Sequence, residues 1–322
     1  MNFNLLIDNL TNPALLFFVL GIIAVYLKSD LKIPANSSKF ISLYLLFAIG
    51  FKGGQELSNE SFTTEIGFSM LFGISIALVI PVYTFFILRR KLNVFDAGAI
   101  AAAYGSVSAV TFVTAVSYLE SHQLTLHGHM VAIMALMESP AIIIGLLLIS
   151  IFSKGETTSI KKRSVIKHSF TNGSVLLILG SLVIGYLANA KQAEGIKPFT
   201  NDLFKGFLAI FLLDMGITSG RKLKSFFSFG WFPFIFAIII PLFNGCLIAM
   251  LSSVVTDDIT NRFIFAVLAA SASYIAVPAA MKISAPKANP GLYLPMALAV
   301  TFPINITIGM PIYFLVVQNI SF

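Results

Sequence analysis

The sequence contains little charge and almost no cysteine. Only 11% of its 322 residues are charged, whereas soluble domains carry about a quarter, and its mean hydropathy is +0.90. The single cysteine, Cys246, has no partner within the chain, so an intrachain disulfide is excluded. These features predict an all-α integral membrane protein. They also give no reason to read the net charge of +7 as a sign of nucleic-acid binding.

Several sequence motifs that support enzymatic chemistry are also missing. There is no GxxxxGK[ST] loop to hold ATP, no GxSxG nucleophile turn, and no CxxC or haem-attachment motif. We therefore expect neither an ATP-driven pump nor an enzyme, and no cofactor.

Long apolar runs dominate what is present. Most are long enough to cross a bilayer core as a helix, the only open structure that satisfies its backbone groups in lipid, although the run near 38–53 is short. About ten transmembrane helices are predicted, at about 13–28, 38–53, 66–88, 95–118, 128–153, 172–190, 203–219, 229–253, 262–281 and 291–317. The N-terminus lacks a basic region and a cleavage pattern, so it is interpreted as the first span.

The basic residues are distributed unevenly between the two sides. Loops after odd-numbered spans contain 16 of the 21 Lys and Arg residues. Because cytoplasmic loops are enriched in Lys and Arg, this asymmetry predicts both termini outside a bacterial inner (plasma) membrane. The basic stretch 154–171 is predicted to be a cytoplasmic linker.

The two halves of the chain have glycine, serine and proline at corresponding positions. Gly54 and Gly220, Ser108 and Ser273, and Pro140 and Pro303 are separated by 163 to 166 residues. Five spans per half is an odd number, so the second half would enter the membrane from the opposite side. The chain is therefore predicted to contain two inverted five-helix repeats, 1–153 and 172–322, as in secondary transporters. The alternative is chance recurrence of small residues.

Two small-residue segments occupy matching positions in the fourth and ninth spans. AAYGSVSAVTF (102–112) contains Ser106 and Ser108, and ASASYIAVP (270–278) contains Ser271 and Ser273. A broken helix exposes N–H groups that hold anions, and hydroxyls can add donors or coordinate Na⁺. A small anion moving with Na⁺ fits these atoms. Alternatively, the serines bond back into their own helices and only allow close packing.

Charged and polar residues inside spans are further candidates. Glu138 is the clearest intramembrane acid and could bind Na⁺, carry a proton or form a structural pair. Asn305 supplies a neutral oxygen in the counterpart region, and Asp214 could form an acid pair with Glu138 in an intramembrane enzyme. Lys52 is expected to snorkel to the interface. The histidines at 122, 127 and 129 are expected to lie in a solvated external loop.

Several of these segments carry a family resemblance along nearly the whole chain. GSVSAVTFVTAVSYLE (105–120), MESPA (137–141), KGFLAIFLLDMG (205–216) and the stretch 269–294 resemble the sodium-dependent bicarbonate transporter family of the cyanobacterial SbtA type. The resemblance implies core and gate domains, an elevator-like motion, a homotrimer and Na⁺-coupled bicarbonate uptake. It also implies that Ser106, Ser108 and Thr111 in one turn, and Ser271 and Ser273 in the other, hold substrate and ion.

The chain departs from the family pattern at one ligand. Where family members commonly have an Asp after the second serine cluster, this chain has Tyr274. Ion binding could then depend on Glu138, or the coupling or the substrate could differ, with Tyr274 donating a hydrogen bond. A different small anion, or an anion channel, is therefore the alternative. The short linker leaves regulation by a PII-like signalling protein open.

Overall fold

The computed structural model describes residues 13–61, 63–153 and 173–319, and all regular elements in these ranges are helical. Each of the ten apolar segments contains at least one helix, whereas the linker 154–171 lies outside the described residues. The first half of the chain contains α2 (Pro13–Tyr26), α3 (Ala35–Asn59), α4 (Thr64–Leu88), α5 (Val94–Gly105), α6 (Ala109–Ser121) and α7 (Gly128–Phe152). The second contains α9 (Gly173–Leu187), α10 (Ala190–Lys197), α11 (Phe204–Phe226), α12 (Trp231–Leu251), α13 (Ile259–Ala270), α14 (Ala276–Ser284), α15 (Pro290–Pro295), α16 (Phe302–Ile304) and α17 (Met310–Asn319).

Six helical stretches in the described residues are long and apolar enough to cross a membrane. They are Thr64–Leu88, Val94–Ser121, Gly128–Phe152, Ala190–Leu223, Trp231–Val254 and Pro290–Asn319. Helices α2 and α13 and the stretch Leu176–Leu187 are apolar but shorter. The chain is therefore a multi-pass helical membrane protein, while the count of ten spans remains a prediction.

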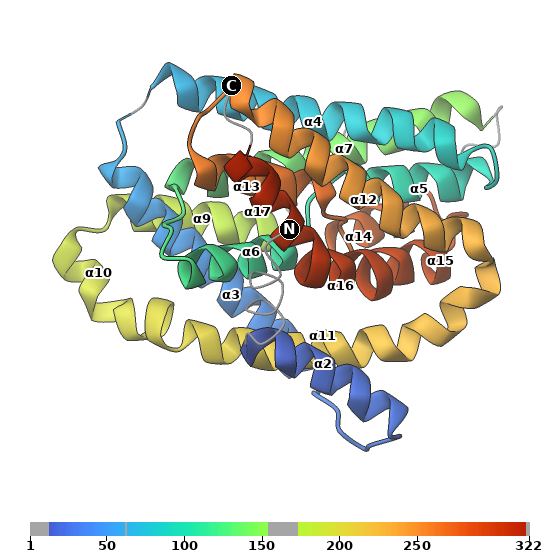
Figure 1. Ribbon diagram of the computed structural model, residues 1–322, viewed down its shortest axis with the longest axis horizontal. Coiled ribbons are helices and arrows are strands. Elements are labelled where there is room, and N and C mark those ends of the chain that lie inside the picture. Colours follow the sequence, from blue (N-terminus) through green and yellow to red (C-terminus); the bar gives the residue numbers. More distant parts are fainter. Residues whose placement is uncertain (1–12, 62, 154–172, 320–322) are drawn as a thin grey trace.

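Four helices form two tightly packed pairs, α2 with α11 and α3 with α9. Glycines permit this approach, because a β-carbon at Gly54 would fall on the backbone oxygen of Leu182, and one at Gly216 on that of Phe18. Small residues at such contacts are typical of helices packed in lipid. We call these four helices the scaffold; α2 and α11 run along the lower edge of Figure 1.

The remaining long helices form a second group, which we call the core bundle. Helix α4 packs on α5 and α7, and α12 packs on α13 and α17. In Figure 1, α4 and α12 lie across the top, while the broken pairs α5–α6 and α13–α14 lie between them and the lower edge. In the stretch Val94–Ser121, 89% of the most apolar window is buried. Broken helices are tolerated at membrane depth when protein surrounds them.

Candidate substrate and ion site

The two predicted helix breaks meet in the core bundle. Ser106 is the C-cap of α5 and Ser271 is the C-cap of α13, both in extended conformation (ψ 172° and 164°). The backbone N–H of Ser108 donates to the Ser271 hydroxyl at 3.0 Å. The N–H of Ser273 donates to the carbonyl of Ala103 at 2.8 Å. Each break therefore supplies a partner for a backbone group that the other leaves unpaired.

A second half-helix begins just after each break. Ser108 is the N-cap of α6, where its hydroxyl accepts from the Thr111 N–H at 3.2 Å. The Ser273 hydroxyl accepts from the Val277 N–H of α14 at 3.5 Å. The sharp end of α5 requires Gly105, because a β-carbon there would overlap the ring of Pro81. The partial positive ends of two half-helices therefore start beside the same contact.

A small cavity, the site cavity, lies between these two helix starts. Its volume is about 20 Å³, and it is lined by Val107, Ser108, Ala109, Glu138, Ser273, Tyr274, Ile275 and Ala276. That volume holds roughly one water-sized group. The carboxylate of Glu138, on α7, makes no hydrogen bond or ion pair with another described residue. The cavity thus combines helix N-termini, hydroxyls and one carboxylate with unused acceptor capacity.

The other candidate residues lie around the site cavity without lining it. The Ser106 hydroxyl points to the backbone oxygen of Glu138 at 3.5 Å, a weak contact. Ser271 is buried, and its hydroxyl donates to the carbonyl of Leu268 at 2.8 Å. Thr111 is also buried, with 1% of its surface exposed. These residues shape the break, whereas Ser108, Ser273, Glu138 and Tyr274 face the cavity.

Asn305 closes the end of α13. Its amide donates to the carbonyl of Ala270 at 2.7 Å, and its oxygen accepts from the Tyr313 hydroxyl at 2.8 Å. Asn244 donates to the neighbouring carbonyl of Ala269 at 3.3 Å. Two side-chain amides therefore cap carbonyls that the helix end leaves free. This contact pattern favours a capping role for Asn305 over the predicted ion-binding role, which stays a prediction.

A second, larger cavity of about 510 Å³ adjoins the first. Tyr274 and Ile275 line both cavities, so Tyr274 stands at the boundary. The larger cavity lies beside the start of α3 and the C-terminal half of α11, and its polar lining includes Ser38, Lys39, Ser42, Asp214, Thr218 and Arg221. Asp214 accepts a hydrogen bond from Ser38 at 2.5 Å. Asp214 and Glu138 line different cavities and share no hydrogen bond, which gives the acid-pair hypothesis no support.

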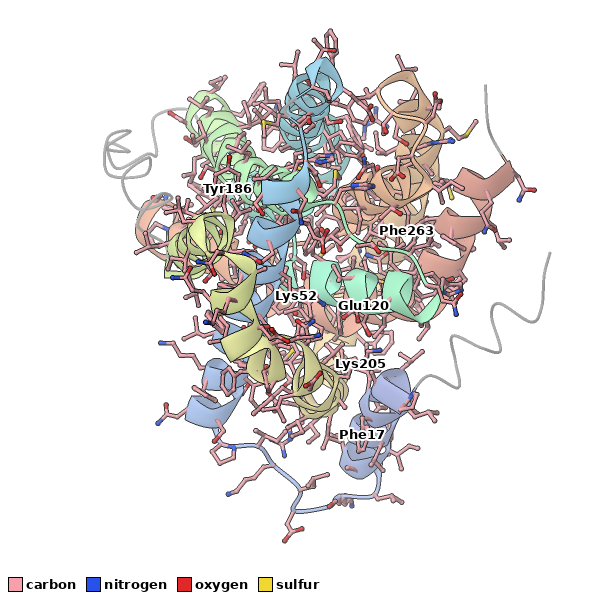
Figure 2. All side chains as sticks on the ribbon, turned by 90° about the vertical axis from the view of Figure 1, so that its left-hand side faces the viewer. Phe17, Lys52, Glu120, Tyr186, Lys205 and Phe263 are labelled. Atoms are coloured by element: carbon pink, nitrogen blue, oxygen red, sulfur yellow. The ribbon has the colours of Figure 1, made fainter. Side chains whose placement is uncertain are left out.

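A cluster of ion pairs that the sequence did not predict lies at the far end of the scaffold. Lys52, on α3, pairs with Glu120 at 2.6 Å, and Lys205, on α11, lies 3.9 Å from the same carboxylate. Figure 2 shows the three side chains on the face where α3, α6 and α11 converge. The sequence did not predict this partner, because Glu120 lies 68 positions away, near the end of α6. The expectation that Lys52 snorkels to the interface stays a prediction.

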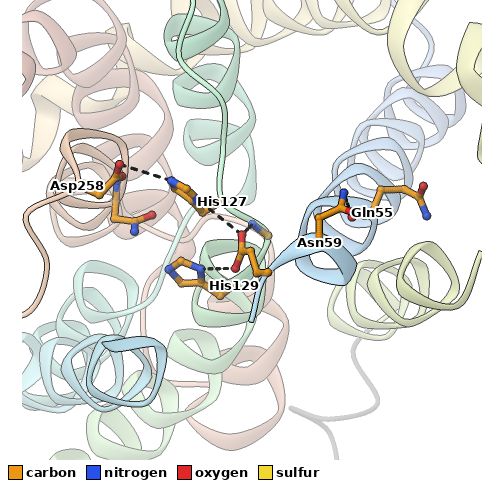
Figure 3. Close-up of polar contacts among 8 residues, drawn as sticks. Gln55, Asn59, His127, His129 and Asp258 are labelled. Atoms are coloured by element: carbon orange, nitrogen blue, oxygen red, sulfur yellow. Dashed lines mark hydrogen bonds and ion pairs between the residues drawn. The ribbon is translucent and has the colours of Figure 1, made fainter. Parts of the chain in front are cut away.

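The expectation of a solvated histidine loop is wrong for His129. Its side chain is 6% exposed, and its Nδ1 lies 2.8 Å from the carboxylate of Glu60, which follows α3. His127 lies between Glu60 and Asp258, 3.5 Å from each (Figure 3). We call Glu60, His127, His129 and Asp258 the outer cluster. Among the described residues, no group of His, Cys, Asp and Glu is arranged to hold a metal ion.

The charges in the outer cluster shift the pKa values of His127 and Asp258. The hydrogen bond with Asp258 raises the pKa of His127 above its usual range, against the opposing effect of burial, and the negative charges of Asp258 and Glu60 add to the rise. Burial alone would raise the pKa of Asp258. Hydrogen bonds from His127 and from the Asn261 N–H outweigh burial, so that pKa lies below its usual value.

The described residues therefore define a multi-pass helical membrane protein in which two broken helices meet at a buried polar site. A family model for the Na⁺-dependent bicarbonate transporter superfamily matches residues 13–318, nearly the whole chain. The chain belongs to this superfamily, which confirms the resemblance seen in its motifs. A comparison with curated protein sequences gave no match.

Proposed function

We propose that the chain imports bicarbonate together with Na⁺ and that the site cavity is where both are held. The observation that supports this proposal is the lining of one cavity by the N-terminal ends of α6 and α14 and by Glu138. The helix ends attract an anion, and Ser108 and Ser273 can orient it. The family's Na⁺ dependence supports Na⁺ as the coupling ion.

The carboxylate of Glu138 provides the physical reason for coupling. An anion bound beside an ionised carboxylate in a poorly solvated cavity would be repelled strongly. Na⁺ bound between them would neutralise the carboxylate and attract the anion, so anion binding would depend on Na⁺. Because Tyr274 stands where the family pattern has an Asp, Glu138 is the carboxylate left to bind Na⁺. Thr111 and Asn305, which have neutral oxygens, are weaker candidates for ion binding.

Bicarbonate has four non-hydrogen atoms and exceeds the space in the site cavity. The two cavities meet at Tyr274, so displacement of this side chain would join them and open the site toward the larger cavity. The Tyr274 hydroxyl has a long contact to the Met215 sulfur, at 3.9 Å, and it also interacts with the Ser108 side chain. A substrate that binds Ser108 would compete for this interaction, which would favour movement of the Tyr274 side chain.

An inverted-repeat architecture with elevator-like motion is our proposal for the transport cycle. The pairing of helices supports it, since α2 of the first half packs on α11 of the second, and α9 of the second packs on α3 of the first. Ser106 and Ser271, like Ser108 and Ser273, are 165 positions apart. The core bundle would carry the site past the scaffold. A homotrimer in the bacterial plasma membrane, with a possible PII-like partner, completes the proposal by family resemblance.

Uptake of radiolabelled bicarbonate into proteoliposomes, with and without an inward Na⁺ gradient, tests the function. We expect Na⁺-dependent uptake in the parent, a strong loss in Ser108→Ala and Ser273→Ala, and loss of Na⁺ coupling in Glu138→Gln. Ser139→Ala is the matched control, because Ser139 neighbours Glu138 on α7, is buried, and does not line the cavity. Folded parent protein without Na⁺-driven bicarbonate uptake would refute the proposal.

A further inference from the structure

The interface between scaffold and core bundle differs at its two ends. Near the start of α3 and the C-terminal half of α11, the cavity of about 510 Å³ separates the scaffold from Tyr274. At the opposite ends of the same helices, charged contacts cross the interface, from Lys52 to Glu120 and from Glu60 to α7. The charge asymmetry of the loops predicts this closed end to be outside. Under the transport cycle proposed above, on which this inference rests, these contacts must break before the site faces outward.

Glu60 joins the scaffold to the first turn of α7. One carboxylate oxygen accepts the backbone N–H of Gly128 at 2.8 Å, and the other lies 2.8 Å from Nδ1 of His129. The helices approach closely here, since a β-carbon at Gly128 would overlap the backbone oxygen of Gly53. Glu60 therefore acts as an N-cap supplied by another helix, and separation of the helices would leave the Gly128 N–H unpaired.

His127 extends this link to α13. Its Nδ1 lies 3.5 Å from a Glu60 oxygen, and its Nε2 lies 3.5 Å from a carboxylate oxygen of Asp258, the N-cap of α13 (Figure 3). A neutral imidazole carries a proton on only one nitrogen, so its other nitrogen would present a lone pair to a carboxylate. Only the imidazolium ion donates on both sides. Both contacts are at ion-pair distance, which suits an imidazolium ion between the two carboxylates better than a neutral ring.

We propose that His127 is an external proton site and that its protonation ties α3 to α7 and α13, holding the outer end of the interface closed. Loss of the proton leaves Glu60 and Asp258 without a shared cation, which weakens closure. The raised pKa of His127 agrees in sign, because a proton bound more tightly in the closed state stabilises that state at low pH. Alkaline conditions outside the cell would favour opening.

The groups around His127 are consistent with this assignment. Glu60 and Asp258 are the two carboxylates that contact it, and the His129 ring lies 5.8 Å away between centroids. The other charged side chains near the ends of α3, α4 and α13 are Glu56, Glu65, Asp257 and Arg262. Among the described residues, none of these four pairs with either histidine. Arg262 instead donates to the carbonyl of Ala249 at 3.1 Å.

A distance measurement across the outer end tests the proposal without relying on transport. Spin labels at Ser58→Cys on α3 and Val254→Cys before α13, in a Cys246→Ser background, report the separation by pulsed electron resonance; both labelled positions are exposed. Between about pH 5.5 and about pH 8.5, a range that spans histidine titration, the longer-distance population should increase by about two- to fivefold, as expected for a partly exposed charge pair.

Matched variants identify the group that titrates. His127→Gln and Asp258→Asn should both flatten the pH response, and Asn retains the ability to cap α13, so the second variant tests the proposal even if the first folds poorly. His122→Gln is the control, because His122 contacts the Tyr118 backbone and Ser121 and forms no ion pair with a carboxylate among the described residues. The proton-site proposal is overturned if the distance distribution of the parent does not change with pH. It is also overturned if His127→Gln keeps the parental pH response.

Uptake assays on the same preparations separate the two proposals. They are run at a fixed bicarbonate concentration, because the fraction of dissolved carbon present as bicarbonate itself changes with pH. A pH-dependent distance without Na⁺-driven bicarbonate uptake would leave the proton site standing and remove the proposed substrate. Normal Na⁺-driven bicarbonate uptake with pH-independent distances would support the proposed function and overturn the proton site.

Discussion

Asn305→Leu is the substitution that best distinguishes a structural role from an ion-binding role near the breaks. Asn305 is fully buried, and its amide donates to the Ala270 carbonyl at 2.7 Å. Leu has a similar shape and removes both polar contacts. The Tyr313 hydroxyl would keep a second acceptor, the backbone oxygen of Pro241 at 3.3 Å, so the Ala270 carbonyl is the group left unpaired.

The expected loss of stability follows from that single unpaired carbonyl. An unsatisfied buried acceptor costs about 1–3 kcal/mol, whereas hydrogen bonds between membrane helices average about 0.6 kcal/mol in double-mutant cycles. We therefore expect Asn305→Leu to lower the free energy of unfolding by about 1 kcal/mol, which corresponds to a fall in the thermal midpoint of roughly 2 °C. The Na⁺ concentration for half-maximal uptake should stay the same.

Thermal unfolding in detergent and Na⁺ titration of bicarbonate uptake measure the two quantities. Asn319→Leu is the control, because its amide caps the Leu315 carbonyl on an exposed part of α17. If Asn305→Leu keeps its thermal midpoint but needs roughly tenfold more Na⁺, equivalent to about 1.4 kcal/mol of lost ion binding, the capping argument is refuted. The predicted role of Asn305 as an ion ligand would then be supported.

Three further predictions concern other parts of the fold. Gly105→Ala places a methyl group against the ring of Pro81 and should destabilise the protein by about 1–3 kcal/mol; an unchanged unfolding midpoint would contradict the close approach. Glu120→Lys should reduce stability by repelling Lys52, and the swapped pair Lys52→Glu with Glu120→Lys should restore about 0.2–1 kcal/mol of coupling in a double-mutant cycle. Because the pKa of His127 is raised in the folded protein, its stabilising effect is present at acidic pH and lost as pH rises through that pKa. The stability difference between parent and His127→Gln should therefore grow on acidification, and a pH-independent difference in unfolding midpoint would exclude this contribution.

The sequence by itself determined the class of protein, the positions of the helices and the location of both breaks. These features are local, since long apolar runs predict helices in lipid, and small-residue interruptions at corresponding positions of the two halves predict broken helices. The breaks at Ser106 to Ser108 and Ser271 to Ser273 were therefore predictable from short stretches of chain. The motifs around them were also sufficient to identify the family.

Only the tertiary structure decided which distant residues share a surface. Glu138 lines the site cavity while Asn305 caps α13, although both are polar residues in apolar spans. His129 is buried against Glu60, and Lys52 meets Glu120, because α3 lies across the starts and ends of helices from the core bundle. The helix period relates residues only three or four positions apart. The sequence pattern therefore does not show contacts between residues 68 or more positions apart. Those contacts depend on how helices pack against one another, and packing is a property of the whole fold.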